Sequence, residues 1–149
     1  MMAGYHQNDA ANEEATWIHP SGERWLRTGD IGFLDDDGFL HLVDRKKDMI
    51  LSGGQNIYPA DIEAVMSEHE AISEIAVIAV ESARWGETPL AVVVLRGAAA
   101  ADEITAWANS RLGKQQRIAA TVFVDELPRN PNGKVLKREL RKQFSDKTF

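Results

Sequence analysis

The chain contains no cysteine, which excludes disulfides, cysteine-based zinc sites and thiol nucleophiles. Positive charge is not in excess either: 17 Lys and Arg residues face 23 Asp and Glu residues, for a formal net charge of −6. Because nucleic-acid-binding proteins generally show a basic face, we expect no nucleic-acid partner. The apolar runs, such as the one near 91–95, are far shorter than a membrane span. Residues 1–15 lack the pattern of a signal peptide, so a cytoplasmic protein without a transmembrane segment is the default expectation.

The hydrophobic pattern predicts a small core of strands and helices. With 149 residues, of which 44% are hydrophobic, the chain can bury one core but hardly two full domains. Near-continuous apolar runs at 72–80 and 90–95 are typical of central strands that are buried on both faces. Pro59 suits the first position of a helix, and we expect a second helix to run from a cap at Asp102 to a stop at Gly113.

The last quarter of the chain completes the pattern. Residues 121–124 read as a strand, 128–134 as a turn-rich loop and 136–144 as a short helix. The order is then strand, helix, strand, strand, helix, strand and helix. This order predicts an α+β fold in which a small central sheet is flanked by helices.

The amino-terminal third looks different. Residues 24–43 predict a β-hairpin, and its turn at 35–38 ends in Gly38, which supplies the positive φ that such a turn needs. Residues 1–23 show no periodicity and are expected to form a loose lead-in. Because the hairpin is too short to hold a core of its own, we interpret it as the edge of something larger.

Four short motifs could carry chemistry. They are Trp25–Asp30, with a carboxylate after a Gly turn; Asp44–Asp48, with five charges between apolar strands; Leu51–Asn56, a bare and flexible glycine loop; and Pro128–Lys134, with one lysine on a proline-stiffened loop. Taken singly, each motif has a simpler interpretation. In the same order, these are a turn cap, a solvated connector, a link between elements and a surface lysine. Their joint order and spacing is a stronger signal.

In this order and spacing the motifs resemble the adenylate-forming superfamily, which includes acyl- and aryl-CoA synthetases, luciferases and the adenylation domains of peptide synthetases. The resemblance runs from about Trp25 to Leu140. The stretches 44–63, 84–87 and 125–134 are close to the form found in fatty-acid and aryl-CoA ligases. The resemblance implies two half-reactions, in which a carboxylic acid and ATP form an acyl-adenylate and coenzyme A then displaces AMP.

The resemblance also implies a domain organisation. In this superfamily a small C-terminal domain swings between two orientations on a large N-terminal domain. Residues 24–43 would then be the end of the N-terminal domain, and residues 44–149 the C-terminal lid. The chain's main partner would be its own N-terminal domain, which would hold the acid pocket and most contacts to Mg²⁺. Without that domain, we expect this chain to be inactive.

The resemblance assigns the adenylation step mainly to Lys134. Its ammonium would bridge the attacking carboxylate and the α-phosphate. At about 4 Å and an effective dielectric near 20, this charge interaction contributes roughly 4 kcal/mol. That energy corresponds to a rate increase on the order of a hundred- to a thousandfold. Asp30 matches the aspartate that receives the ribose hydroxyls in this superfamily. Arg45 matches a residue that contacts the nucleotide, and Asp44 matches the hinge residue at which the small domain begins. Acetylation of Lys134 by a lysine acetyltransferase would remove the charge.

The thioester step would use another face. Ser52, Gly53 and Gly54 would line the tunnel for the pantetheine arm of coenzyme A, where a backbone without Cβ atoms can approach the ligand. Trp85 is a weaker candidate for a coenzyme A contact, and an aromatic at the edge of the core is an equal alternative. One departure from the superfamily is Gln115–Ile118, which replaces a Tyr-Lys-x-Pro run.

Other classes fit less well. Leu51–Gln55 spells the signature loop of transporter ATPases, but no upstream phosphate loop of the form G-x-x-x-x-G-K-[S/T] precedes it. A calcium loop with Gly38 at its sixth position would begin at Phe33, which cannot bind a cation. The four histidines are too scattered for zinc, and no serine lies in a G-x-S-x-G elbow. A free-standing, non-enzymatic module that binds a nucleotide or a partner remains open.

Overall fold

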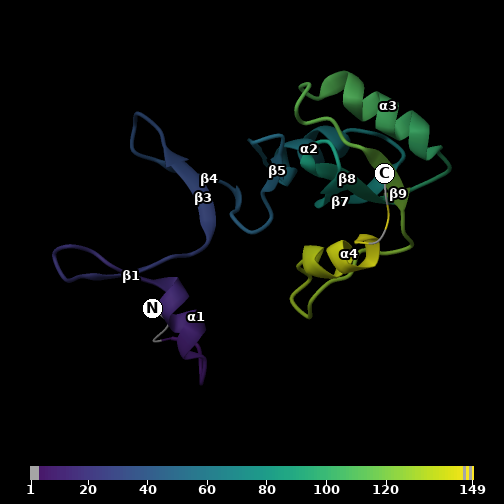
Figure 1. Ribbon diagram of the computed structural model, residues 1–149. Coiled ribbons are helices and arrows are strands. Elements are labelled where there is room, and N and C mark those ends of the chain that lie inside the picture. The colour runs from purple at the N-terminus through teal and green to yellow at the C-terminus, as the bar shows by residue number, and fades with distance from the viewer. Residues whose placement is uncertain (1–3, 146, 148) are drawn as a thin grey trace. The chain divides into compact units, whose positions relative to one another are not determined.

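The computed structural model describes residues 4–145, 147 and 149, and it separates into two compact units, Met1–Lys47 and Asp48–Phe149. Figure 1 labels elements of both units. We call them unit 1 and unit 2. The division falls between Lys47 and Asp48, so unit 2 begins four residues after the predicted start of the lid at Asp44.

Unit 1 consists of one short helix and two hairpins. Its elements are α1 (Asp9–Ala15), β1 (Thr16–Ile18), β2 (Arg24–Leu26), β3 (Asp30–Leu34) and β4 (Leu40–Arg45). β1 pairs with β2 and β3 with β4, both antiparallel. The predicted turn at 35–38 is confirmed: the amide of Gly38, at φ 83°, donates to the Asp35 carbonyl over 3.0 Å. None of the described residues 4–47 is buried.

The loose lead-in expected over residues 1–23 is wrong for residues 9–18, where the structure has α1 and β1. The side chain of Asn8 caps the helix by accepting from the Ala11 amide over 3.1 Å. Because α1 buries no residue, it has no need for an apolar stripe, and periodicity could not reveal it. Residues 1–3 lie outside the described residues.

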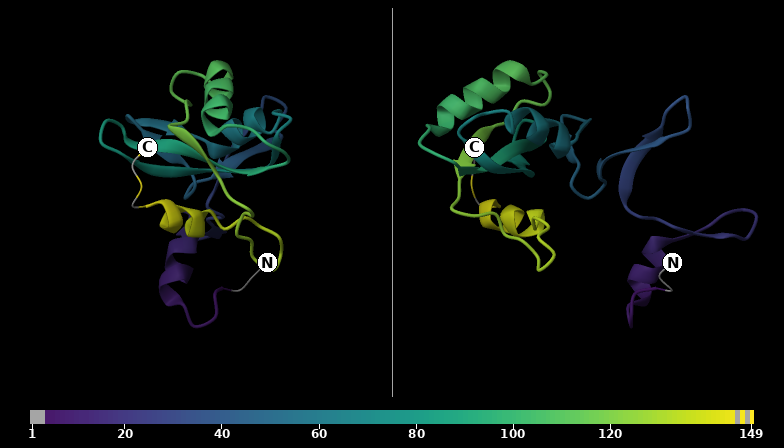
Figure 2. Two further views of the ribbon diagram at one scale, coloured as in Figure 1. Left: turned by 90° about the vertical axis from the view of Figure 1, so that its right-hand side faces the viewer. Right: turned by 180° about the vertical axis from the view of Figure 1, so that it is seen from behind.

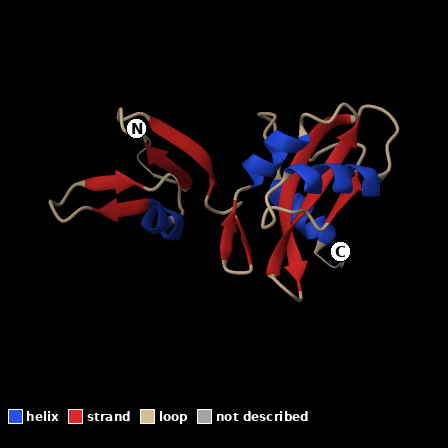
Figure 3. Ribbon diagram, turned by 90° about the horizontal axis from the view of Figure 1, so that it is seen from above, coloured by secondary structure: helices blue, strands red, loops and turns tan. Residues whose placement is uncertain are grey.

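Unit 2 is built on a five-stranded sheet. Its strands are β5 (Ile50–Ser52), β6 (Gln55–Ile57), β7 (Ile72–Ser82), β8 (Gly86–Leu95) and β9 (Ala120–Phe123). β8 pairs antiparallel with β7 from Ile72↔Leu95 to Ser82↔Gly86 and parallel with β9, while β5 joins it at Ser52↔Gly86. Figure 3 shows these strands in red and the helices in blue.

Three helices cover the two faces of this sheet. They are α2 (Pro59–Met66), α3 (Ala101–Arg111) and α4 (Lys137–Phe144). In the left view of Figure 2, α3 lies on one side of the sheet and α4 on the other. Alternate residues of the long strands serve the two sides, as the strand period of two requires: Val77 belongs to the cluster with α2 and α3, and Ile78 to the cluster with α4.

The predicted α+β fold, with strands buried on both faces, is therefore confirmed. Two local predictions are wrong. Asp102 does not cap α3: the cap residue is Ala100, without a side-chain bond, and Asp102 lies in the first turn, where a negative charge suits the helix dipole. The loop at Gly53-Gly54 is not a bare linker but the two-residue turn between β5 and β6, with φ of 56° and 81°. Positive φ at both positions is what a type I′ hairpin turn requires.

Candidate functional site: an exposed lysine on a tied loop

The loop of residues 128–136, here called the lysine loop, folds back on itself and holds Lys134 near its tip. Arg129 and Val135 form an antiparallel bridge, and the Leu136 amide donates to the Pro128 carbonyl over 2.7 Å. Asn130 closes the tip, because its Oδ1 accepts from the Lys134 amide over 2.8 Å. Gly133, at φ 81°, completes the turn. The backbone of Lys134 is thus fixed by hydrogen bonds on both sides.

The side chain of Lys134 is exposed. Among the residues that the structure describes, no carboxylate lies within ion-pair distance of its ammonium. The ammonium of Lys134 is therefore not buried inside unit 2, and it is accessible to a ligand bound by another domain. This is the arrangement that a phosphate-binding role for Lys134 requires.

The candidates for coenzyme A contact lie at another place on unit 2. The Gly53 amide donates to the Trp85 carbonyl over 2.8 Å, which joins the β5–β6 turn to the β7–β8 turn. A Cβ at Gly53 would lie 2.9 Å from Trp85 Cε3, whereas a Cβ at Gly54 would meet nothing within 4 Å. Gly53 thus makes room for Trp85, and Gly54 is the position that is open to a ligand. Ser52 pairs with Gln55 beside them.

The two candidate sites of unit 2 lie at opposite ends of β7. Arg129 of the lysine loop pairs with Glu74 near the start of β7. Ser82 ends β7 and accepts from the Trp85 amide over 3.3 Å. Eight residues at about 3.3 Å each separate the two ends by about 26 Å. One rigid unit 2 would therefore present Lys134 and the Gly54 turn to different places, rather than to one ligand at once.

Unit 1 brings Asp30 and Arg45 together. They face each other across the β3–β4 ladder, and Arg45 Nε lies 2.7 Å from Asp30 Oδ1. Arg45 also donates to the Thr28 carbonyl over 3.3 Å. A carboxylate beside a guanidinium offers acceptors for sugar hydroxyls and donors for phosphate oxygens. Asp44, the predicted hinge, lies in paired strand β4, where its Oδ1 accepts from the Arg45 amide over 2.7 Å.

Sequence reasoning missed a hollow of about 720 Å³ in unit 1. Four cations line it, together with Tyr5, Ala11, Glu14, Ala15, Thr28 and Gly29; the cations are Arg27, Arg45, Lys46 and Lys47. Only Arg45 of these was singled out from the sequence. The run Arg45-Lys46-Lys47 was the available signal, but a charge run by itself does not distinguish a lined hollow from a solvated connector.

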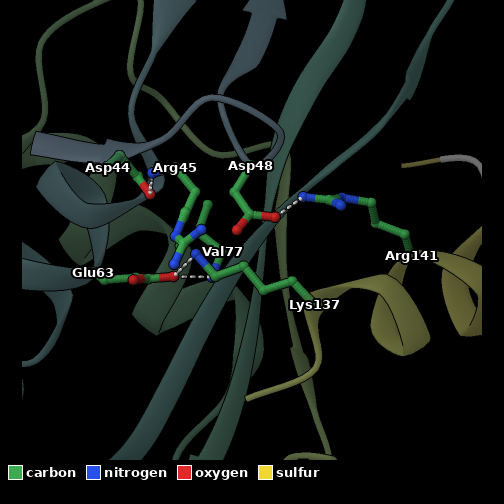
Figure 4. A network of polar contacts seen from close by, with 7 residues as sticks. All are labelled: Asp44, Arg45, Asp48, Glu63, Val77, Lys137 and Arg141. Carbon is green, nitrogen blue, oxygen red and sulfur yellow. Dashed lines mark hydrogen bonds and ion pairs between the residues drawn. The ribbon is translucent and has the colours of Figure 1, made fainter. Parts of the chain in front are cut away.

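Polar contacts also anchor α4, the helix that follows the lysine loop (Figure 4). Lys137 Nζ lies 2.7 Å from Glu63 Oε1, and the same oxygen accepts from the Val77 amide over 2.7 Å. Arg141 pairs with the buried Asp48 over 2.6 Å. These contacts join residues far apart in sequence, so the sequence alone gave no sign of them.

Over residues 4–145, 147 and 149, no group of three or more His, Asp or Glu side chains is placed to hold a metal ion. Among the described residues, no helix has the length and apolar character needed to cross a bilayer.

The sequence of this chain is similar to that of known proteins. Residues 61–134 match the family described as AMP-binding enzyme C-terminal domain. The 2-succinylbenzoate–CoA ligase of Bacillus velezensis is 43% identical over 140 residues, which cover 94% of this chain and 28% of that ligase.

Solved structures of CoA synthetases are also similar to this chain. An o-succinylbenzoate CoA synthetase of Bacillus subtilis, in complex with its acyl-adenylate intermediate, is 40% identical with a TM-score of 0.82, and the match covers 95% of this chain and 28% of that one. A Mycobacterium tuberculosis fatty acyl CoA synthetase is also 40% identical, with a TM-score of 0.68 and coverage of 97% and 28%. The chain thus spans little more than a quarter of the length of the relatives it matches. On the strength of sequence and fold together, it belongs to the family of AMP-binding enzyme C-terminal domains, within the adenylate-forming superfamily.

Proposed function

We propose that this chain is the C-terminal part of an ATP-dependent carboxylic acid–CoA ligase. The observation that carries the proposal is the exposed ammonium of Lys134, held on a closed loop and free of a carboxylate partner within the described part of the chain. In the first half-reaction a carboxylate oxygen attacks the α-phosphorus of ATP, and the bond to pyrophosphate breaks. Lys134 would neutralise the negative charge that gathers between the two reactants.

In the second half-reaction the sulfur of coenzyme A attacks the acyl carbon, and AMP leaves. The open turn at Gly54, with Ser52 and Gly53, would line the path of the pantetheine arm. Trp85 is 47% exposed, and the Arg84 guanidinium lies 4.5 Å from the centre of its ring. The indole and its cation would contact the coenzyme at the mouth of that path. The separation along β7 supports a rotation of unit 2 between the two steps.

Unit 1 would contribute to nucleotide binding. Asp30 would receive the ribose hydroxyls, and Arg45 would contact the nucleotide from its place in the cationic hollow. The pivot between the steps would be Asp44 near the end of β4, close to the point after Lys47 where the two units divide. Mg²⁺ would be held with the triphosphate mainly by the N-terminal domain.

An N-terminal domain would also account for the apolar surface of unit 1. The β3–β4 hairpin exposes large hydrophobic side chains, each more than half accessible: Phe33, Leu34, Phe39, Leu40 and Leu42. Isolated hairpins are marginal in water, so such a surface needs a partner to cover it. The relatives are long enough to supply one, because this chain matches only 28% of their length.

The choice of the carboxylic acid substrate and the regulation of Lys134 are part of the same proposal. The solved o-succinylbenzoate CoA synthetase and the solved fatty acyl CoA synthetase are both 40% identical to this chain, so the acid would be selected by the N-terminal domain. The exposed Lys134 would be accessible to a lysine acetyltransferase, which would remove its charge. We place the complete enzyme in the cytoplasm.

A graft tests the proposal. The matching 28% of the Bacillus subtilis synthetase would be replaced by this chain, and the product assayed for ATP–pyrophosphate exchange and for thioester formation with 2-succinylbenzoate. We expect both activities to return, compared with the truncated synthetase. A folded graft that forms no acyl-adenylate would contradict the proposal.

The alternative, a nucleotide-binding module without catalysis, is favoured only by the cationic hollow of unit 1. Calorimetric titration of the 149-residue chain with AMP distinguishes the two. Tight binding by the chain alone, together with an inactive graft, would favour the module.

A further inference from the structure

The cations around the lysine loop are not equivalent. Each of the neighbours of Lys134 that carries a positive charge has a carboxylate within 3.1 Å: Arg129 pairs with Glu74, Lys137 with Glu63, and Arg138 with Glu139. Lys134 has no such partner among the described residues. The pairing of its neighbours therefore leaves one ammonium available, and it also ties the loop down on both sides of that ammonium.

The first tie lies on the amino-terminal side of Lys134. Arg129 uses both arms of its guanidinium: Nη1 donates to the Gly133 carbonyl over 2.6 Å, and Nη2 to Glu74 Oε2 over 2.5 Å. One side chain thus closes the loop next to Lys134 and fastens it to β7. Only a forked donor can make both contacts in one plane.

The second tie lies on the carboxyl-terminal side. Lys137 opens α4, and its ammonium lies 2.7 Å from Glu63 Oε1 on α2. The same oxygen accepts from the Val77 amide on β7. The Lys137 and Glu63 side chains are only 16% and 24% exposed, so this tie is shielded from solvent more than the first. Both ties therefore end on β7, at Glu74 directly and at Val77 through Glu63.

We propose that Glu74, Arg129, Glu63 and Lys137 are positioning residues that fasten the lysine loop to β7 and thereby set where the Lys134 ammonium is presented. The catalytic consequence rests on the proposed function. An ammonium that must meet two reacting groups loses rate steeply when it is displaced, on the order of a hundredfold for about 1 Å. A loop attached at one end only would spread the ammonium over several positions.

The first experiment uses the 149-residue chain and needs no activity. Glu74→Gln keeps the shape of the side chain but removes the charge that holds Arg129. Amide hydrogen exchange at Asn130, Gly133 and Lys134 should become about tenfold faster, while exchange in β8 stays unchanged. The matched control is Glu81→Gln, the same change on an exposed residue of the same strand, which should leave the loop unchanged. Loop exchange that is equal in wild type and Glu74→Gln would overturn the proposal.

The second experiment uses the graft. Glu74→Gln should lower pyrophosphate exchange about tenfold through kcat, with the KM for ATP unchanged and thioester formation from supplied acyl-adenylate within twofold of wild type. Arg129→Lys can still pair with Glu74, so it should lower pyrophosphate exchange less than Arg129→Met, which cannot pair with it. Equal losses in both half-reactions would mean a general structural defect and would overturn the positioning role. If the wild-type graft forms no adenylate, the proposed function has failed, and the exchange experiment still decides whether the ties hold the loop.

Discussion

Residues 48–149 enclose their own hydrophobic core on both faces of a sheet, whereas none of the described residues between 4 and 47 is buried. The same chain therefore contains one part that satisfies its apolar side chains internally and one part that exposes them. Hydrophobic burial dominates folding, so the stability of this chain must come from unit 2. The candidate residues follow the same division, since Asp30 and Arg45 lie in unit 1 and Lys134 in unit 2.

The largest effect should come from the core of unit 2. Leu140→Ala removes a fully buried side chain of α4 and should lower the free energy of unfolding by about 2–5 kcal/mol. Leu42→Ala, at a side chain that is 67% exposed in unit 1, should change it by less than about 0.5 kcal/mol. Urea denaturation of the 149-residue chain measures both. Similar losses for the two variants would show that unit 1 is part of the same cooperative core.

The predictability of the fold follows the same contrast. The strands β7 and β8 were evident from their continuous apolar runs, because burial on both faces leaves a strong mark in sequence. Helix α1 left no such mark, since it buries nothing. The Gly53-Gly54 turn was misread because two glycines indicate flexibility and a type I′ turn equally well. Only the short strand Gln55–Ile57, paired back on Ile50–Ser52, decides between them.

The candidate site was predictable to a similar extent. The sequence predicts a role for Lys134 because several motifs agree over more than a hundred residues, and the exposure of its side chain is consistent with the proposed role. The ties that hold its loop were not predictable. Glu74 and Arg129 are separated by 55 positions, and neither residue type indicates a partner at that distance. The cationic hollow was missed for the same reason, because it is assembled from Tyr5 to Lys47 by folding.

An intermediate effect is expected at the turn between β5 and β6. Gly53→Ala places a Cβ 2.9 Å from Trp85 at a positive φ, and it should lower the free energy of unfolding by roughly 2 kcal/mol. Gly54→Ala carries only the cost of its positive φ, about 1 kcal/mol. In the graft, Gly54→Leu should impair the thioester step and spare pyrophosphate exchange. Exchange that falls as far as overall turnover would count against the tunnel role.

The smallest effect concerns the exposed hairpin of unit 1. The His41 side chain, 2.6 Å from Asp35, and the Phe39 amide lower the pKa of the Asp35 carboxyl below its usual value. A lowered carboxyl pKa stabilises the folded turn above the usual pKa, and this contribution is lost as the pH falls through the lowered value. A titration of the Asp35 carboxyl by NMR should show a midpoint below the usual value for an aspartate, and His41→Ala should raise it. An unchanged midpoint in His41→Ala would rule out this cause.

In the proposed function, unit 2 delivers a positive charge to the adenylation step and a different surface to the thioester step. The most direct measurement compares both half-reactions in the graft for Lys134→Ala and for Lys142→Ala, a change at another exposed lysine of unit 2. We predict that Lys134→Ala lowers pyrophosphate exchange on the order of a hundred- to a thousandfold and leaves thioester formation from supplied acyl-adenylate within about threefold of wild type. Lys142→Ala should leave both unchanged. Equal loss of both half-reactions in Lys134→Ala, or no loss of either, would show that unit 2 does not divide its surfaces between the two steps.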